Sequence, residues 1–143
     1  MKITPDEFVE EDEDTWLLED FEVSPSRPRV RITVYNKGEP PSAAQARKID
    51  KYLARLDALI AQAAPFILEN YSYDHFKRLG IAEGKLVEET PEAVARAVTL
   101  KSIYVFDADE DDFELSFSAP WDPHHSFDVE FEAGEATDCS VNG

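Results

Sequence analysis

Residues 113–132 read FELSFSAPWDPHHSFDVEFE, and this stretch decides the fold class. Apolar residues stand at every second position from Phe113 to Phe117, and again from Phe127 to Phe131. The positions between them carry acidic side chains or serines. A period of two is typical of strands with one face on a core and the other in water. The stretch therefore predicts two neighbouring antiparallel strands with one wet face.

Strand patterns continue on both sides of this stretch. Residues 100–106 are dense in strand-forming side chains, and Ala133-Gly134 predicts a turn into a final edge strand. Further upstream, apolar and polar residues alternate just before Asn36-Lys37-Gly38. The additional strands are expected at residues 16–23, 30–35, 100–106 and 136–141.

Helices are predicted between the two groups of strands. Ser42, with Gln45 three residues later, forms a capping-box pattern that marks a helix start. One apolar stripe follows at spacings of three and four residues, formed by Ile49, Leu53, Leu56, Ile60, Ala63 and Ile67. Pro65 is expected to kink this helix or to start a new one. Thr90-Pro91 predicts a second, short helix.

The order of strands, helices and strands indicates the α+β class. We expect an antiparallel sheet, built from the N-terminal strands and the C-terminal meander, packed against one long helix and a short helix. A length of 143 residues fits one domain. Residues 1–14 are expected to be an acidic tail, mobile or loosely docked, and residues 15–143 a single domain.

Charge is distributed in blocks along the chain. The net charge is −17 at pH 7, and residues 102–143 hold twelve acidic residues without one lysine or arginine. Residues 1–22 are also acidic, whereas residues 27–101 are net basic and could neutralise part of both ends. Nucleic acid and anionic membranes carry the same sign, so we expect neither as a partner. A basic protein is the expected partner, and solubility alone is the alternative.

Cysteine content and hydropathy set the expected location. No apolar run is long enough to cross a membrane, and the first residues, MKITPDEFVEEDED, do not form a secretory signal. Cys139, the single cysteine, excludes an internal disulfide and fits a reducing compartment. We therefore expect a cytoplasmic protein, and no sequence motif calls for a cofactor.

The acidic residues of the C-terminal third are the candidate partner-binding site. Those between two predicted strands resemble the start of a calcium loop, but the central glycine and the distal glutamate of such a loop are missing. An acidic hairpin turn is the better interpretation, and the strand residues beyond it should present carboxylates to water. The candidate residues are Asp107, Asp109, Glu110, Asp111, Asp112, Glu114, Asp128, Glu130 and Glu132.

A second candidate lies between the two alternating runs. His124 and His125 follow Trp121 and Asp122, and two histidines with an aspartate could bind a metal. Adjacent residues of an extended segment point to opposite sides, however, so the two histidines do not easily share one ion. We expect Trp121 to fill the core at the turn, with Asp122 and His125 bracing it by hydrogen bonds.

The segment around Trp121 resembles a group of small bacterial domain families of unknown function. Their signature is a strand, then Trp-Asp-x-Glu-His-Gly, then a strand of alternating apolar residues. Trp121, Asp122 and His125 fit the signature, whereas His124 replaces the usual glutamate and Ser126 the usual glycine. Several such families occur beside polymorphic toxins and are thought to act as immunity proteins. The resemblance implies a cytoplasmic protein that binds and neutralises a toxin.

Three hypotheses of function follow. The first is an immunity-type protein, without enzymatic activity, whose acidic surface covers a basic site on a toxin such as a nuclease. The second is a small enzyme or metal-binding domain that uses Asp122, His124 and His125. The third is a structural or regulatory subunit that dimerises through the helix stripe or a free sheet edge. The sequence leaves the oligomeric state open.

Overall fold

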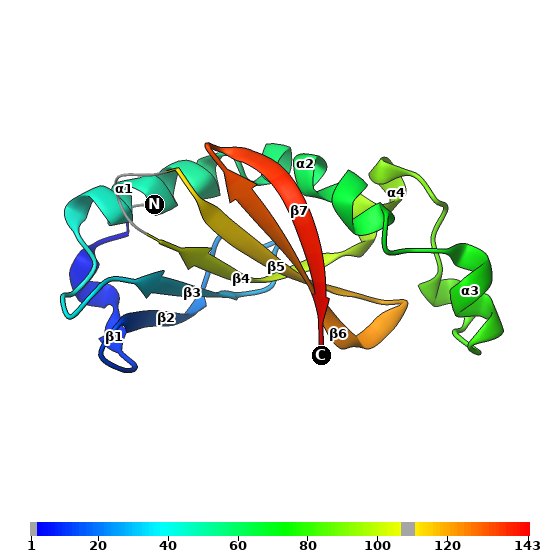
Figure 1. The fold of residues 1–143 in the computed structure, drawn as a ribbon, viewed down its shortest axis with the longest axis horizontal. Coiled ribbons are helices and arrows are strands. Elements are labelled where there is room, and N and C mark those ends of the chain that lie inside the picture. Colours follow the sequence, from blue (N-terminus) through cyan, green and yellow to red (C-terminus); the bar gives the residue numbers. More distant parts are fainter. Residues whose placement is uncertain (1–2, 107–110) are drawn as a thin grey trace.

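The computed structural model describes residues 3–106 and 111–143. Within them, seven strands form one sheet whose spatial order follows the chain from β1 to β7 (Figure 1). The strands are β1 Val9–Glu10, β2 Thr15–Phe21, β3 Val30–Tyr35, β4 Thr99–Val105, β5 Phe113–Ala119, β6 Asp122–Glu132 and β7 Glu135–Asn142. The α-helices are α1 Ala43–Ala54, α2 Leu56–Leu68, α3 Tyr73–Arg78 and α4 Pro91–Ala97. Short 3-10 helices are η1 Pro5–Glu7 and η2 Glu83–Lys85.

The sheet is mixed, with one parallel pair. Strands β3 and β4 run parallel, and every other neighbouring pair is antiparallel. Parallel neighbours need a long crossover connection, and the chain from α1 to α4 supplies it. The expected α+β class and the C-terminal meander are confirmed.

The predicted long helix is two helices. Ser42 and Gln45 form the predicted capping box: the Gln45 amide donates to Ser42 Oγ at 3.1 Å, and the Ser42 amide donates to Gln45 Oε1 at 2.9 Å. The break lies at Arg55, whose backbone leaves the helical region with φ −115° and ψ 18°. Pro65 was expected to kink or restart the helix, but it lies inside α2.

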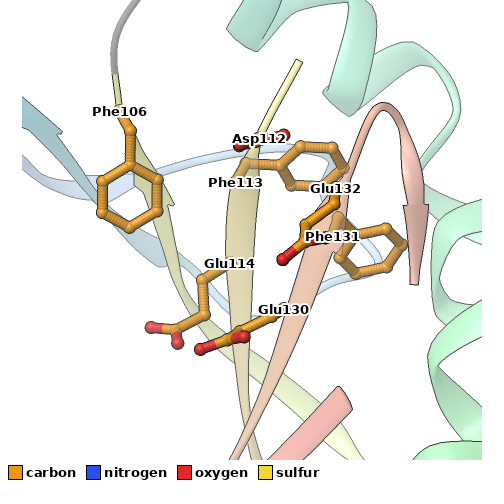
Figure 2. A pocket seen from close by; sticks show the side chains of 7 residues that line it. All are labelled: Phe106, Asp112, Phe113, Glu114, Glu130, Phe131 and Glu132. Atoms are coloured by element: carbon orange, nitrogen blue, oxygen red, sulfur yellow. The ribbon is translucent and has the colours of Figure 1, made fainter. Parts of the chain in front are cut away.

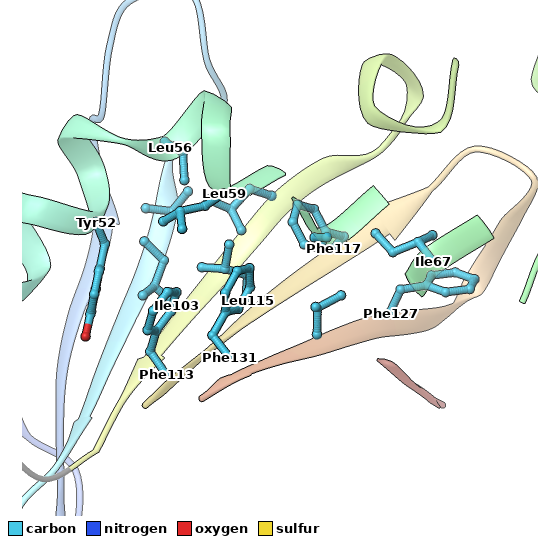
Figure 3. Close-up of a cluster of buried hydrophobic side chains, with 14 of the residues drawn as sticks. Tyr52, Leu56, Leu59, Ile67, Ile103, Phe113, Leu115, Phe117, Phe127 and Phe131 are labelled. Carbon is cyan, nitrogen blue, oxygen red and sulfur yellow. The ribbon is translucent and has the colours of Figure 1, made fainter. Parts of the chain in front are cut away.

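The core lies between the helices α1 and α2 and one face of the sheet (Figure 3). Alternate residues of β5 and β6 project into it, as the period of two predicted. Of the predicted stripe, Ile49, Ala63 and Ile67 are fully buried against them, whereas Leu53 and Ile60 are only partly buried. Leu59, which the stripe did not include, is also buried. The largest buried side chains of the sheet are Phe113, Leu115, Phe117, Phe127, Phe131, Ile32 and Ile103. Burial of this apolar area is the main force that holds the helices on the sheet.

The N-terminal segment is part of the packed structure. Ile3 and Phe8 are buried in the core, and the Ile3 amide donates to Asp50 Oδ1 of α1 at 2.9 Å. Strand β1 pairs with β2 at the edge of the sheet. The segment expected to be an acidic tail therefore supplies two core side chains and an edge strand.

The second face of the sheet is open. In the described part of the chain, α1 and α2 lie over one face of the sheet, and no helix lies over the opposite face of β4 to β7 (Figure 1). Alternation along the strands sends the apolar residues toward the helices and the polar residues to this open face. The candidate acidic residues of β5 and β6 therefore share one exposed surface.

Candidate functional site

Carboxylates on the open face stand in direct register across three strands. Glu114 of β5 is opposite Glu130 of β6, and Glu130 is opposite Asp138 of β7. Directly opposed residues of antiparallel strands share a face and lie close together, so these three side chains form one row. Asp128 and Glu132 of β6, and Asp112 just before β5, lie beside this row. The acidic face, as named below, consists of Asp112, Glu114, Asp128, Glu130, Glu132 and Asp138.

Glu114 is the acidic residue most affected by its surroundings. Its side chain is partly buried at the centre of the face, with Tyr104 on one side and Glu130 on the other. Burial, and then the charges of Asp128 and Glu130, raise the pKa of Glu114 to about 7. The ionised form of this carboxyl is therefore disfavoured near neutral pH unless a cation approaches.

Asp128 is held in place by neighbouring polar groups. Ser116 donates to Asp128 Oδ1 at 2.5 Å, and Asn142 donates to Oδ2 at 2.6 Å. Ser126 also donates to Oδ2 at 3.3 Å. These bonds join β5, β6 and β7, so they fix one charge of the acidic face in position.

Several arginine and lysine side chains pair with acidic residues outside the acidic face. Arg29 and Arg31 contact Glu22 and Glu19 at 3.8 Å and 3.2 Å, so the basic middle does neutralise part of the N-terminal acidic block. Arg27 pairs with Asp57, and Lys77 with Glu83. Among the described residues, no ion pair with lysine or arginine involves a member of the acidic face.

A groove opens at the end of the acidic face that lies next to the β6–β7 turn. It has a volume of about 250 Å³, and the side chains of Asp112, Glu114, Glu130 and Glu132 line it together with Phe106 (Figure 2). Figure 2 shows Glu114 and Glu130 pointing to the same side of the sheet. The Asp112 carboxylate accepts the Ala133 amide at 3.1 Å, which anchors this side chain at the β6–β7 turn.

Aromatic residues border the acidic face on the side of β3 and β4. Tyr35 stacks on Phe106 with ring centroids 5.3 Å apart and an interplanar angle of 8°. Tyr104 lies 6.4 Å from Tyr35 and is opposite Glu114. Phe106 keeps 39% of its surface exposed, although it is apolar. Aromatic surface and carboxylates thus meet at one place on the open face.

The remaining acidic candidates from the sequence are not members of the acidic face. Asp111 belongs to the helix side, where its Oδ1 accepts the hydroxyl of Tyr52 at 2.7 Å. Its backbone oxygen accepts the Gly134 amide at 2.9 Å. Asp111 thus joins α1, the start of β5 and the β6–β7 turn. Asp107, Asp109 and Glu110 lie outside the described residues.

Trp121, Asp122 and His125 lie at the turn between β5 and β6. Trp121 is fully buried at the β5–β6 turn and packs against Tyr71 with ring centroids 4.4 Å apart. Asp122 Oδ1 lies 2.7 Å from His125 Nδ1, which braces the turn. His124 is exposed. The Trp121 indole nitrogen is buried, and it has no hydrogen-bond partner among the described residues.

In residues 3–106 and 111–143, no group of three or more His, Cys, Asp or Glu side chains is arranged to hold a metal ion. No helix of this part is long and apolar enough to cross a membrane.

Sequence reasoning missed three members of this surface. Asp138 falls in the predicted edge strand, but its alignment with Glu130 depends on a register shift after Glu130 that no sequence pattern shows. Tyr35 ends β3 and Phe106 directly follows β4, and they meet because these two strands, far apart in the chain, pair in parallel. The signal that the sequence offers for these two residues is that both side chains are aromatic.

Fold and surface together define a class: a small α+β domain whose sheet is covered by helices on one face and lined with carboxylates on the other. The chain belongs to the DUF6985 family, described as a domain of unknown function, which matches residues 7–141. The match extends from η1 into β7, so it includes every residue of the acidic face. No curated protein and no solved structure gives a significant match to the chain.

Proposed function

We propose that this chain is an immunity-type protein, which binds a basic bacterial toxin through the acidic face and neutralises it by occlusion. The row of Glu114, Glu130 and Asp138 carries this proposal. Like charges directly opposite each other on a sheet cost stability, and among the described residues none of these three carboxylates forms an ion pair with lysine or arginine. A partner's cations would remove this cost on binding.

The physical properties of the face suit rapid and selective association. Several carboxylates of one sign attract a basic surface over a distance, which raises the association rate and makes it depend on salt. The face lies on strands fixed by the core, and Asp128 is held by three hydrogen bonds, so little ordering is needed on binding. Occlusion requires no chemistry from this chain.

The kind of basic partner is proposed from the turn motif. Trp121, Asp122 and His125 resemble the signature of families that occur beside polymorphic toxins. Their structural role in the β5–β6 turn supports a shared fold rather than a shared reaction. A toxin that acts in the cytoplasm, such as a nuclease with a basic substrate site, is the partner that this combination favours.

The test is retention of a toxin from lysate of the source cells, followed by a growth assay. The immobilised wild-type chain should retain a basic protein that elutes at intermediate salt. That protein should stop growth when expressed alone, and co-expression of this chain should restore growth. The variant Glu130→Lys with Glu132→Lys should lose about tenfold or more in affinity and should no longer protect.

The matched control changes the same charge elsewhere. Glu39 and Glu88 are exposed loop residues outside the sheet. The variant Glu39→Lys with Glu88→Lys should retain the toxin and protect the cells as the wild type does. Equal loss of protection in both double variants would show that net charge, and not the acidic face, controls binding. Affinity that does not change with salt would also contradict the proposal.

A further inference from the structure

The groove beside Phe106 has a chemically mixed lining. Its rim carries carboxylates, whereas the rings of Phe113 and Phe131, which also border it, point toward the core and are each 1% exposed (Figure 2). Phe106 adds an exposed ring at the side of β4. An occupant that fits this lining has an apolar stem and a cationic end. A cation without apolar surface would make no favourable contact with the exposed ring of Phe106, the aromatic wall of the groove.

The exposed ring of Phe106 distinguishes between the two cationic side chains. Tyr35 supports Phe106 by parallel stacking, so the ring is held in place although 39% of its surface is exposed. A guanidinium group is planar, is weakly hydrated and stacks on aromatic rings, and it donates two parallel hydrogen bonds to a carboxylate. An ammonium group is a compact and strongly hydrated charge without these properties.

We propose that the groove between Phe106 and Glu114 is the docking site for an arginine side chain of the basic protein partner. Glu114 and Glu130 lie directly opposite each other, and the guanidinium would bridge their carboxylates while it contacts the Phe106 ring. Charge complementarity identifies the occupant as cationic, and the aromatic wall identifies it as arginine rather than lysine. This inference rests on the proposed function, whose partner it describes in more detail.

Two peptides of equal charge test the inference without knowledge of the partner. Hexa-arginine and hexa-lysine peptides are titrated into the full chain, and amide and aromatic resonances are followed by NMR. Both peptides should shift the resonances of Glu130 and Asp138, and hexa-arginine should bind about tenfold more tightly. Shifts of the Phe106 ring should be large with hexa-arginine and small with hexa-lysine.

Two variants separate the aromatic contribution from the charge. Phe106→Leu should remove the preference for arginine and leave the affinity for hexa-lysine unchanged. Leu79→Ala removes apolar surface from another exposed residue, after the end of α3, and should change neither affinity. If Phe106→Leu does not fold, as judged by its amide spectrum, Glu114→Gln takes its place, and it should lower the affinity for hexa-arginine more than that for hexa-lysine.

The outcomes distinguish this inference from the function on which it rests. Equal affinity for the two peptides, with shifts confined to the acidic face, would overturn the arginine site and leave the acidic binding face intact. Absence of binding by both peptides would overturn both. Free L-arginine is a further probe: if it binds as tightly as hexa-arginine, a small molecule and not a protein side chain occupies the groove, and the inference fails.

Discussion

Glu114 and Glu130 lie directly opposite each other on β5 and β6, on the face of the sheet that points away from α1 and α2. Such a pair of like charges is unfavourable in the isolated domain. The core beneath them is closely packed, with Phe113, Leu115 and Phe131 fully buried, so the strands cannot shift to separate the charges. The domain therefore keeps an electrostatic cost that stability measurements detect without any partner.

Replacement of Glu130 by glutamine should stabilise the domain. The substitution keeps the size of the side chain and removes one of two opposed charges. The free energy of unfolding should rise by about 0.5 kcal/mol, within the range measured for cross-strand pairs. Urea denaturation followed by circular dichroism at about pH 8, above the raised pKa of Glu114, measures this difference.

The control for this prediction is Glu39→Gln. Glu39 is an exposed loop residue before α1, so the variant loses the same formal charge at a site distant from the acidic face. Its urea midpoint should stay close to that of the wild type. Equal stabilisation of the two variants would attribute the effect to net charge and would contradict a local repulsion between Glu114 and Glu130.

Stability should fall as pH rises through the titration of Glu114. The pKa of this carboxyl is raised from 4.5 to about 7, first by burial and then by Asp128 and Glu130 of the facing strand. The folded state therefore holds a proton that the unfolded chain has already lost. The stabilising contribution is fully present below about pH 4.5 and is lost as pH rises through about 7.

The variant Glu114→Gln isolates this contribution, because glutamine does not titrate. The difference in free energy of unfolding, variant minus wild type, should increase by about 1 kcal/mol between about pH 5 and pH 8, a value reduced for partial solvent exposure. Urea denaturation of both proteins across this range gives the difference. Parallel pH profiles for wild type and variant would show that Glu114 does not titrate in this window.

Much of the fold was predictable because its strands and helix starts follow local rules. Alternation located β3 and β5, and Ser42 with Gln45 located the start of α1. The break between α1 and α2 was not predictable from Pro65, because an exposed proline is tolerated inside α2 whereas the backbone changes direction at Arg55. Burial of Ile3 and Phe8 was hidden among acidic neighbours, since two apolar residues form no periodic pattern.

The candidate site was predictable only where it depends on local alternation along a strand. Alternation places Glu114 and Glu130 on the wet face of each strand, but it does not give the register that sets them opposite each other. Asp111 and Asp112 are adjacent, so one lies toward the helices and the other toward the open face. The pairing of Tyr35 with Phe106 depends on a parallel contact between distant segments, which no local pattern encodes.

Removal of the Tyr52 hydroxyl should destabilise the domain. Tyr52 is 5% exposed, its ring stacks on Phe113 at 3.9 Å, and its hydroxyl donates to Asp111 Oδ1 at 2.7 Å. Burial and the bond to Asp111 raise the pKa of Tyr52, so the hydroxyl stays a donor at every pH of interest. Tyr52→Phe keeps the stack, loses the bond to a carboxylate and should cost about 1–2 kcal/mol of unfolding free energy.

A double-mutant cycle with Asp111→Ala checks this assignment. If the two side chains stabilise the fold through their mutual bond, the double variant should lose less than the sum of the two single losses. Thermal or urea unfolding of the four proteins gives the coupling energy. Additive losses would mean that Tyr52 and Asp111 contribute independently, and the bond between α1 and the start of β5 would then have no measurable strength.

Replacement of Ala133 by asparagine should stabilise the β6–β7 hairpin. Ala133 and Gly134 form its two-residue turn and have φ values of 51° and 81°, a region that alanine rarely adopts and asparagine tolerates. Ala133→Asn should raise the free energy of unfolding by about 0.5–1 kcal/mol in urea denaturation. Gly134→Ala should lower it, because a Cβ at residue 134 would lie 2.8 Å from Asp111 Oδ2 in addition to the backbone strain. A loss of stability in Ala133→Asn would show that the turn does not hold this conformation in solution.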